Sequence, residues 1–122
     1  MPRALLKEKE IYRLWIIAHR DFPKTERFGL GQKIEQSFLD VLEYTFAVVY
    51  LVGEKKILML SKTIAKLDNL KFFLQLAWES HLVKTEKYAE ISAGLEETGR
   101  MLGGWRKGLQ AEEQKLLLKK QE

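Results

Sequence analysis

Helical periodicity with very few interruptions is the feature that most constrains the fold of this 122-residue chain. Proline occurs only at positions 2 and 23, and glycine is sparse before residue 94. Strand-type alternation of apolar and polar residues is nearly absent, whereas apolar residues recur at the three- and four-residue spacing of helices. The sequence therefore predicts an all-α fold.

Four helices are expected, over residues 4–21, 30–51 and 55–79, and from residue 84 or 85 to about residue 119. The first helix should stop before Phe22-Pro23, because the residue before proline disfavours the α region. Residues 23–28 then form a loop, and residues 53–54 and 80–84 form turns. Short connections join antiparallel neighbours, so the prediction is a single domain over residues 1–122, an antiparallel up-down-up-down four-helix bundle. Residues 109–122 continue the last helix as a C-terminal extension with acidic and basic side chains.

The composition argues against catalysis, metal binding and membrane insertion. No cysteine is present, which excludes disulfides and thiolate metal sites. His19 and His81 stand apart from any carboxylate cluster, and no paired-carboxylate or phosphate-loop motif occurs. Uncharged runs such as residues 44–53 are too short to span a bilayer, and no signal peptide is visible in residues 1–20. We expect a cytoplasmic protein that is not an enzyme and holds no cofactor or metal.

Two helices carry more apolar surface than a monomeric bundle needs. In the helix over residues 30–51, one stripe that includes Ile34 and Phe38 is assigned to the core, and a second stripe points away from it. In the helix over residues 55–79, apolar residues also lie outside the core stripe that contains Leu67. The residues outside these core stripes are Leu39, Leu42, Phe46, Tyr50, Phe72, Phe73 and Leu76. Exposed apolar patches usually mark protein partners, so we expect an interface here, either between copies of the chain or with another protein. The alternative is an apolar monomer whose loops cover the excess.

The first helix shows the same excess of apolar residues. Its core face is assigned from a set of residues that share one side of the helix, namely Leu5, Tyr12, Ile16 and His19. This assignment leaves Ile11, Leu14 and Ile17 outside the core face.

Basic residues away from the apolar stripes are the candidates for binding nucleic acid or a partner protein. The net charge is +4, from 21 Lys and Arg against 17 Asp and Glu. Lys71 is unusual because it lies within the apolar stripe of its helix, where it must snorkel, pair with a carboxylate or face a charged partner. The candidate set is Arg13, Arg20, Lys62, Lys66, Lys71, Arg106 and Lys107.

Spacing supports two pairs within this set. Arg13 and Arg20 lie seven positions apart, and Lys62 and Lys66 lie four positions apart, so each pair shares a helix face. Basic stripes without interleaved exposed aromatic residues favour contacts with phosphates over contacts with bases.

Two adjacent glycines, Gly103 and Gly104, interrupt the last helical segment. Each costs about 1 kcal/mol against alanine inside a helix, so the pair needs a reason. Either the glycines permit the close approach of another helix, or they break the helix before a frayed tail. Trp105 follows them, and we expect it to anchor the last helix in the core.

Three segments resemble the Avd proteins, which are the accessory variability determinants of diversity-generating retroelements. Residues 22–35, FPKTERFGLGQKIE, resemble the family run FPKxxRFxLGQRIE. Residues 100–106 match the family signature RMLGGW with its trailing cation, and residues 70–77, LKFFLQLA, resemble the family stretch LRxLLRLA. The resemblance follows the order of the family segments and covers nearly the whole chain.

The resemblance implies a four-helix-bundle protomer that assembles into a homo-oligomeric ring, typically a pentamer. It also implies binding to a reverse transcriptase and its RNA, in a complex that makes error-prone cDNA from a template repeat and diversifies a variable gene. The Avd-like protein itself would not be catalytic. Lys71 and Gln75 depart from the family, which often has arginine at both positions, and residues 109–122 extend past its last signature.

A related family provides the alternative reading. Four-helix-bundle proteins encoded in intervening sequences of 23S ribosomal RNA genes share the Phe-Pro start, and would have an RNA- or protein-binding role. Their second helix usually carries a segment similar to SIPSNIAEG, whereas residues 36–43 here read QSFLDVLE. This difference favours the Avd resemblance.

Overall fold

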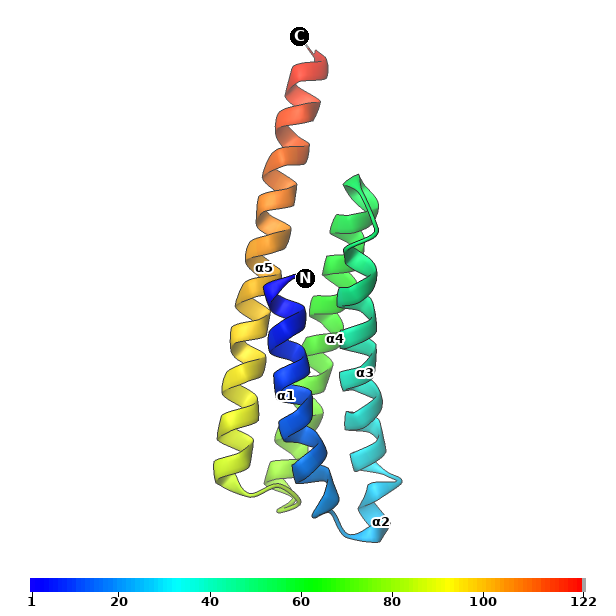
Figure 1. The fold of residues 1–122 in the computed structure, drawn as a ribbon, viewed down its shortest axis with the longest axis vertical. Coiled ribbons are helices and arrows are strands. Elements are labelled where there is room, and N and C mark those ends of the chain that lie inside the picture. The colour runs from blue at the N-terminus through cyan, green and yellow to red at the C-terminus, as the bar shows by residue number, and fades with distance from the viewer. Residues whose placement is uncertain (122) are drawn as a thin grey trace.

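The computed structural model describes residues 1–121, which form five helices and no strand. The helices are α1 (Arg3–Arg20), α2 (Lys24–Arg27), α3 (Leu30–Val48), α4 (Gly53–Glu79) and α5 (Thr85–Gln121). The four long helices pack side by side, and consecutive ones run in opposite directions (Figure 1). The predicted all-α four-helix bundle is confirmed.

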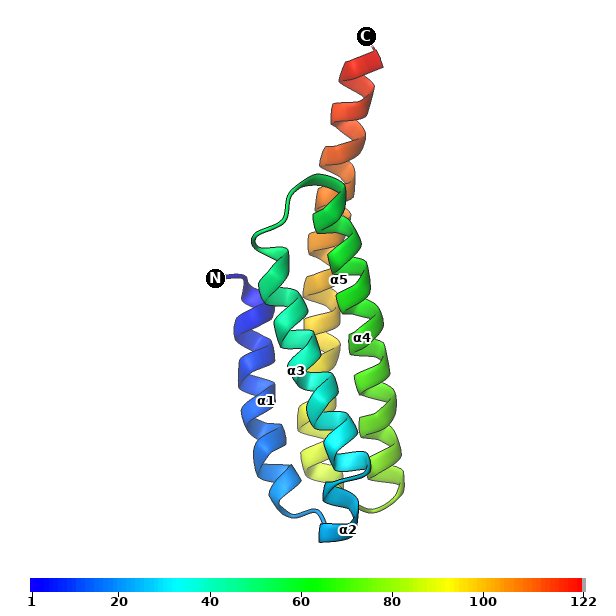
Figure 2. The ribbon, with the colours of Figure 1, turned by 90° about the vertical axis from the view of Figure 1, so that its right-hand side faces the viewer.

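The helix ends differ from the prediction in two places. Residues 23–28 were expected to be a loop, but Lys24–Arg27 form one helical turn, α2, below the bundle (Figure 2). The helix predicted over residues 30–51 ends at Val48, and the next begins at Gly53 rather than residue 55. Gly53 has a φ of 61°, a backbone conformation that glycine adopts without strain.

The core of α1 is rotated relative to the face expected from the sequence. Ile11 and Trp15 are 1% and 0% exposed, whereas Ile16 is only half-buried. Trp15 stacks on Phe38 of α3, with ring centroids 5.8 Å apart. Its indole Nε1 donates to Glu35 Oε1 at 3.2 Å, so that the whole side chain can be buried with its polar atom satisfied.

The segment between α1 and α3 is held by residues of the run 22–35. Arg27 donates from Nε to the Phe22 carbonyl at 3.0 Å and from Nη2 to the Arg20 carbonyl at 2.8 Å, where α1 ends. A Cβ atom on Gly31 would lie 2.6 Å from His19 Nε2 and 3.0 Å from the Glu26 carbonyl oxygen, so a larger residue would have to displace His19. These residues therefore fix the angle at which the chain enters α3.

The close helix approach that the sequence placed at Gly103 and Gly104 occurs instead at Gly94. A Cβ atom there would lie 2.6 Å from Ile11 Cγ1, where α5 crosses α1. At Gly103 and Gly104 an added Cβ would meet nothing within 4 Å, and α5 continues through both. Within the protomer, both expected roles of this glycine pair are therefore wrong.

Trp105 lies at the margin of the core and not inside it. Its half-buried ring packs against the core, and Lys56 Nζ lies 5.6 Å from the ring centroid. The ring also lines a hollow with Pro2, Arg3 and Ala4 at the start of α1, so Trp105 anchors α5 at the margin of the bundle and not in its interior.

Candidate nucleic-acid interface

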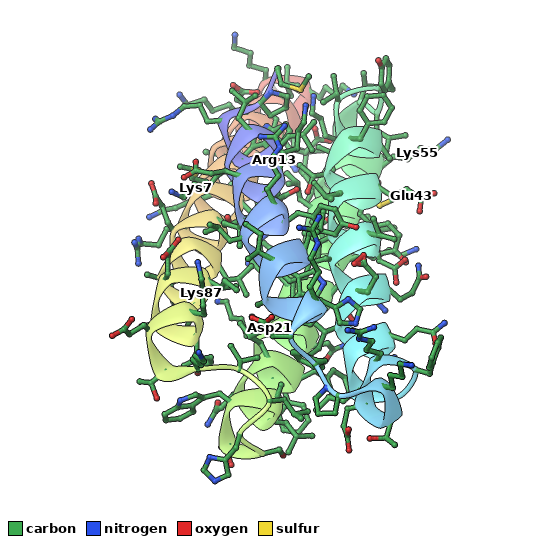
Figure 3. The ribbon with its side chains drawn as sticks, turned by 60° about the horizontal axis from the view of Figure 1, so that its bottom comes forward. Lys7, Arg13, Asp21, Glu43, Lys55 and Lys87 are labelled. Carbon is green, nitrogen blue, oxygen red and sulfur yellow. The ribbon has the colours of Figure 1, made fainter. Side chains whose placement is uncertain are left out.

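Arg13 and Arg20 lie on the outer side of α1 and are exposed. Neither takes part in an ion pair among residues 1–121. Figure 3 labels Arg13 on α1. Their spacing of seven residues corresponds to about 10 Å along the helix axis. Two uncompensated guanidinium groups on one helix face suit contact with a phosphate chain.

Arg27 was not among the predicted binding residues, although it lies next to Arg20. The side chains that line a hollow of about 270 Å³ at this end of the bundle are Ile16, His19, Arg20, Arg27 and Glu35. Glu35 is already the acceptor for the hydroxyl of Tyr12 at 2.5 Å and for the indole of Trp15. The sequence signal for Arg27 is its place in the run 22–35, which carries the family resemblance.

Lys62 is exposed on α4 and lines a second hollow, of about 210 Å³, near the α3–α4 connection. The other lining residues are Leu51, Lys55, Leu58 and Met59. Lys55 extends outward from the bundle (Figure 3). Neither lysine takes part in an ion pair in the described part of the chain. This hollow therefore combines an apolar floor with two cations.

Lys66 does not share the environment of Lys62. Its Nζ lies 3.1 Å from Asp40 Oδ2, and the two side chains are 24% and 19% exposed. This ion pair joins α4 to α3, so Lys66 contributes to the packing of the bundle and offers little net charge outside it.

Lys71 pairs with carboxylates, which is one of the three possibilities expected for it from the sequence. Its Nζ lies 3.2 Å from Glu96 Oε1 on α5 and 4.0 Å from Asp68 Oδ1. Two carboxylates thus pair with the cation that was predicted as a binding candidate from its place in the apolar stripe of α4.

Arg106 has a hydrogen-bond partner within the protomer, whereas Lys107 takes part in no ion pair of the described residues. Arg106 is half-buried and donates from Nη1 to Ser61 Oγ on α4 at 3.3 Å. Lys107 is exposed one position further along α5. Of this pair, only Lys107 projects a free side chain from the protomer.

The candidate cations do not form one patch. Helix α1 packs against α3 and α5, and α4 also packs against α3 and α5, so α1 and α4 lie diagonally across the bundle. The exposed cations of α1 and those of α4 are consequently on different faces. A single protomer presents separate pairs of charges, and only an assembly could bring pairs from different protomers together.

The predicted apolar interface residues are mostly exposed. On α3 and just beyond it, Leu39 is 41%, Phe46 51% and Tyr50 72% exposed, and the rings of Phe46 and Tyr50 are in edge contact at 5.3 Å. Leu42 is half-buried. We call Leu39, Phe46 and Tyr50 the α3 surface.

On α4, Phe72 is 61% and Leu76 39% exposed. We call these two residues the α4 surface. Phe73, which was predicted to belong with them, is half-buried against the core, and Lys33 Nζ lies 5.5 Å from its ring centroid.

These two surfaces point in different directions. Leu39 follows Glu35, which contacts α1, by one helical turn, so the α3 surface lies on the α1 side of α3. On α4, Lys66 faces α3 and Lys71 faces α5, and Phe72 lies outside both contacts. Two separate apolar surfaces on different faces match a head-to-tail contact better than a two-fold one.

Two titratable groups of the described residues have raised pKa values. Glu8 is 2% exposed, and burial raises its pKa to about 8 even though Thr45 Oγ1 donates to its Oε2 at 2.8 Å. Burial and the neighbouring Glu35 raise the pKa of Tyr12 to about 12. Residues 1–121 contain no cluster of three or more metal-ligating side chains. None of the helices described is long and apolar enough to cross a membrane.

One known protein family matches most of the chain. A family model described as bAvd-like matches residues 6–109. The match includes all of α3 and α4 and ends within α5, where the helix leaves the bundle. No curated protein sequence matches the chain.

Proposed function

The chain belongs to the bAvd-like family, and we propose on this premise that it is a non-catalytic accessory protein of a diversity-generating retroelement. In this role it binds a reverse transcriptase and its RNA in the cytoplasm and supports mutagenic cDNA synthesis. The observation that supports RNA binding is the exposure of Arg13, Arg20 and Lys62 without an ion pair in residues 1–121.

The proposed working form is a homo-oligomeric ring, most simply a pentamer as the family resemblance implies. The α3 surface of one protomer would contact the α4 surface of the next, which is the heterologous contact that closes into a ring. A ring repeats each pair of exposed cations around its axis, so that a net charge of +4 per chain produces a strong local field.

Salt dependence and charge reversal test the RNA contact. Binding to the cognate RNA should weaken steeply as salt increases, because each neutralised phosphate releases counterions. Lys62→Glu and Arg13→Glu should each weaken binding without reducing the melting temperature, since both side chains are exposed and unpaired in the described residues. Lys84→Glu, at the exposed α4–α5 turn, is the matched control for an equal change of charge.

Lys66→Glu is unsuitable for this test, because it would place a second carboxylate beside Asp40. An RNA affinity that does not change with salt would contradict a charge-based mode. Equal losses of RNA affinity for Lys84→Glu and Lys62→Glu would show that only the total charge matters. They would contradict the assignment of Lys62 to the RNA site.

The ring is tested by mass. Light scattering should give a closed oligomer, and Phe46→Ser or Phe72→Ser should each reduce it toward the monomer, since both rings are more than half exposed in the protomer. A wild-type protein that remains monomeric at micromolar concentration would contradict the proposed assembly.

A further inference from the structure

The last three turns of α5 project beyond the rest of the bundle, as both ribbon views show (Figures 1 and 2). We call residues 110–121 the C-terminal extension. It is roughly 18 Å long at the rise of an α-helix. The family match ends at residue 109, so this segment lies beyond the matched part of the chain.

The extension is a helix whose apolar residues are not covered by the rest of residues 1–121. Leu116, Leu117 and Leu118 are 55%, 51% and 57% exposed. Isolated helices of this length are marginal in water, and most helical stability in proteins comes from packing an apolar face. A partner that covers its leucines would therefore stabilise the extension.

One face of the extension continues the buried leucine row of α5. Leu95 and Leu102 are 1% and 0% exposed in the bundle, and Leu109 packs partly against the core. Leu116 follows at the same spacing of seven residues, so it lies on the same side of the helix. A seven-residue leucine repeat is the seam along which one helix packs on another.

The charges around Leu116 define which partner fits. Glu112 and Glu113 lie one turn before Leu116, and Lys119 and Lys120 lie one turn after it. Glu113 has no basic residue three or four positions away, and Lys120 has no acidic one, so neither is neutralised along its own helix.

We propose that the extensions of two chains pair antiparallel, about a two-fold axis near Leu116. This arrangement places Leu116 against its own copy. It also brings the two glutamates of one chain opposite the two lysines of the other, twice by symmetry. A parallel pair would place like charges opposite each other and is disfavoured. The occupant of this helix face is thus a second copy of the same extension.

One such pair is weak on its own. Two three-turn helices bury far less than the ~1,600 Å² of a standard interface. If the protomers form the proposed ring, the extensions of one ring can pair with those of a second, and several weak contacts then act together. This reinforcement rests on the proposed ring, whereas the pairing of two extensions does not.

Sedimentation velocity over a protomer concentration series tests the pairing. The wild-type protein should show its base assembly, monomer or ring, and a species of twice that mass that increases with concentration. Leu116→Ser should weaken the doubling about tenfold or more, because it removes the apolar contact at the axis. Leu118→Ser should leave it unchanged, since residue 118 is turned by about 200° away from Leu116.

Charge reversal tests the direction of pairing. The double variant Glu112→Lys and Glu113→Lys should lose the doubling, because all facing charges become positive. Adding Lys119→Glu and Lys120→Glu to the same chain should restore it, since the reversed pattern is again complementary in the antiparallel pair.

Three sedimentation results would each overturn the proposal. They are a wild-type protein that never doubles, equal effects of Leu116→Ser and Leu118→Ser, and a quadruple variant that stays at the base mass. Cosedimentation with anionic vesicles that Leu116→Ser abolishes would also overturn it, by showing that the leucines enter a bilayer. The base mass reports the ring and the doubling reports the extension, so failure of one is distinguishable from failure of the other.

Discussion

Replacing Glu8 with glutamine should stabilise the protein at neutral and alkaline pH. Glu8 is 2% exposed, and its Oε1 has no hydrogen-bond partner in the described structure. Burial raises its pKa from an ordinary value of 4.5 to about 8, while the bond from Thr45 Oγ1 acts in the opposite direction. The folded protein therefore favours the protonated carboxyl up to about pH 8.

The sign of the pH dependence follows from this raised pKa. Below the unfolded pKa the carboxyl is protonated in both states, and its stability contribution is fully present. Between pH 4.5 and about 8 the folded state holds a proton that the unfolded chain has released, so the free energy of unfolding falls with pH. Above about pH 8 both states are ionised and the loss levels off.

The magnitude is large enough to measure. At about 1.4 kcal/mol per pKa unit, the difference between 4.5 and about 8 corresponds to roughly 5 kcal/mol. Relaxation and water entry around a buried charge reduce such costs, so we expect a measured loss of about 2–4 kcal/mol. Glu8→Gln keeps a side-chain oxygen as an acceptor for Thr45 and removes the titration.

Urea unfolding from pH 5 to pH 9, at one fixed protomer concentration, measures this effect. Other groups that titrate in this range contribute equally to both proteins, so the difference between wild type and Glu8→Gln isolates Glu8. The variant should gain stability relative to wild type as pH increases. An equal pH slope in the two proteins would refute the burial of an uncompensated carboxyl at this position.

Three substitutions test the packing of α5. Gly94→Ala should destabilise the fold by about 1–3 kcal/mol, because the new methyl group meets Ile11. An unchanged melting temperature would show that α1 and α5 can move apart at this point without a loss of stability. Gly103→Ala should stabilise by up to about 1 kcal/mol, and a loss of stability or assembly would show that another copy occupies the space beside it. Trp105→Ala should cost less than the ~3–5 kcal/mol of a fully buried tryptophan, and thermal unfolding that gave this full value would place the ring in a closed interface.

The helices themselves were predictable because their signals are local. The end of α4 at Glu79 and the start of α5 at Thr85 agree with the prediction, as do the core positions that include Ile34, Phe38 and Leu67. Each of these depends on apolar spacing within one helix, which the sequence displays directly.

The errors arise where the outcome depends on a second helix. The sequence shows glycines at both 94 and 103 but not the point at which α1 crosses α5, and only Gly94 lies at that crossing. Lys66 looked like a surface lysine because Asp40, its partner, is 26 positions away in the sequence. Glu8 was overlooked because its residue type favours solvent, although its spacing from Leu5 and Ile11 places it on the buried face.

The run 22–35, which carries the family resemblance, makes contacts that hold the fold together. Its presence therefore supports a shared fold and not a shared binding surface. Arg27 binds the carbonyls at the end of α1, Gly31 admits His19, and Glu35 accepts bonds from Tyr12 and Trp15. Residues with these contacts specify how α1 meets α3, so their presence in the run is explained by the fold of the bundle. The exposed cations and apolar surfaces make no such contacts and can change without loss of the fold. Substitutions on those surfaces, which leave the run 22–35 intact, are therefore the ones that separate partner binding from folding.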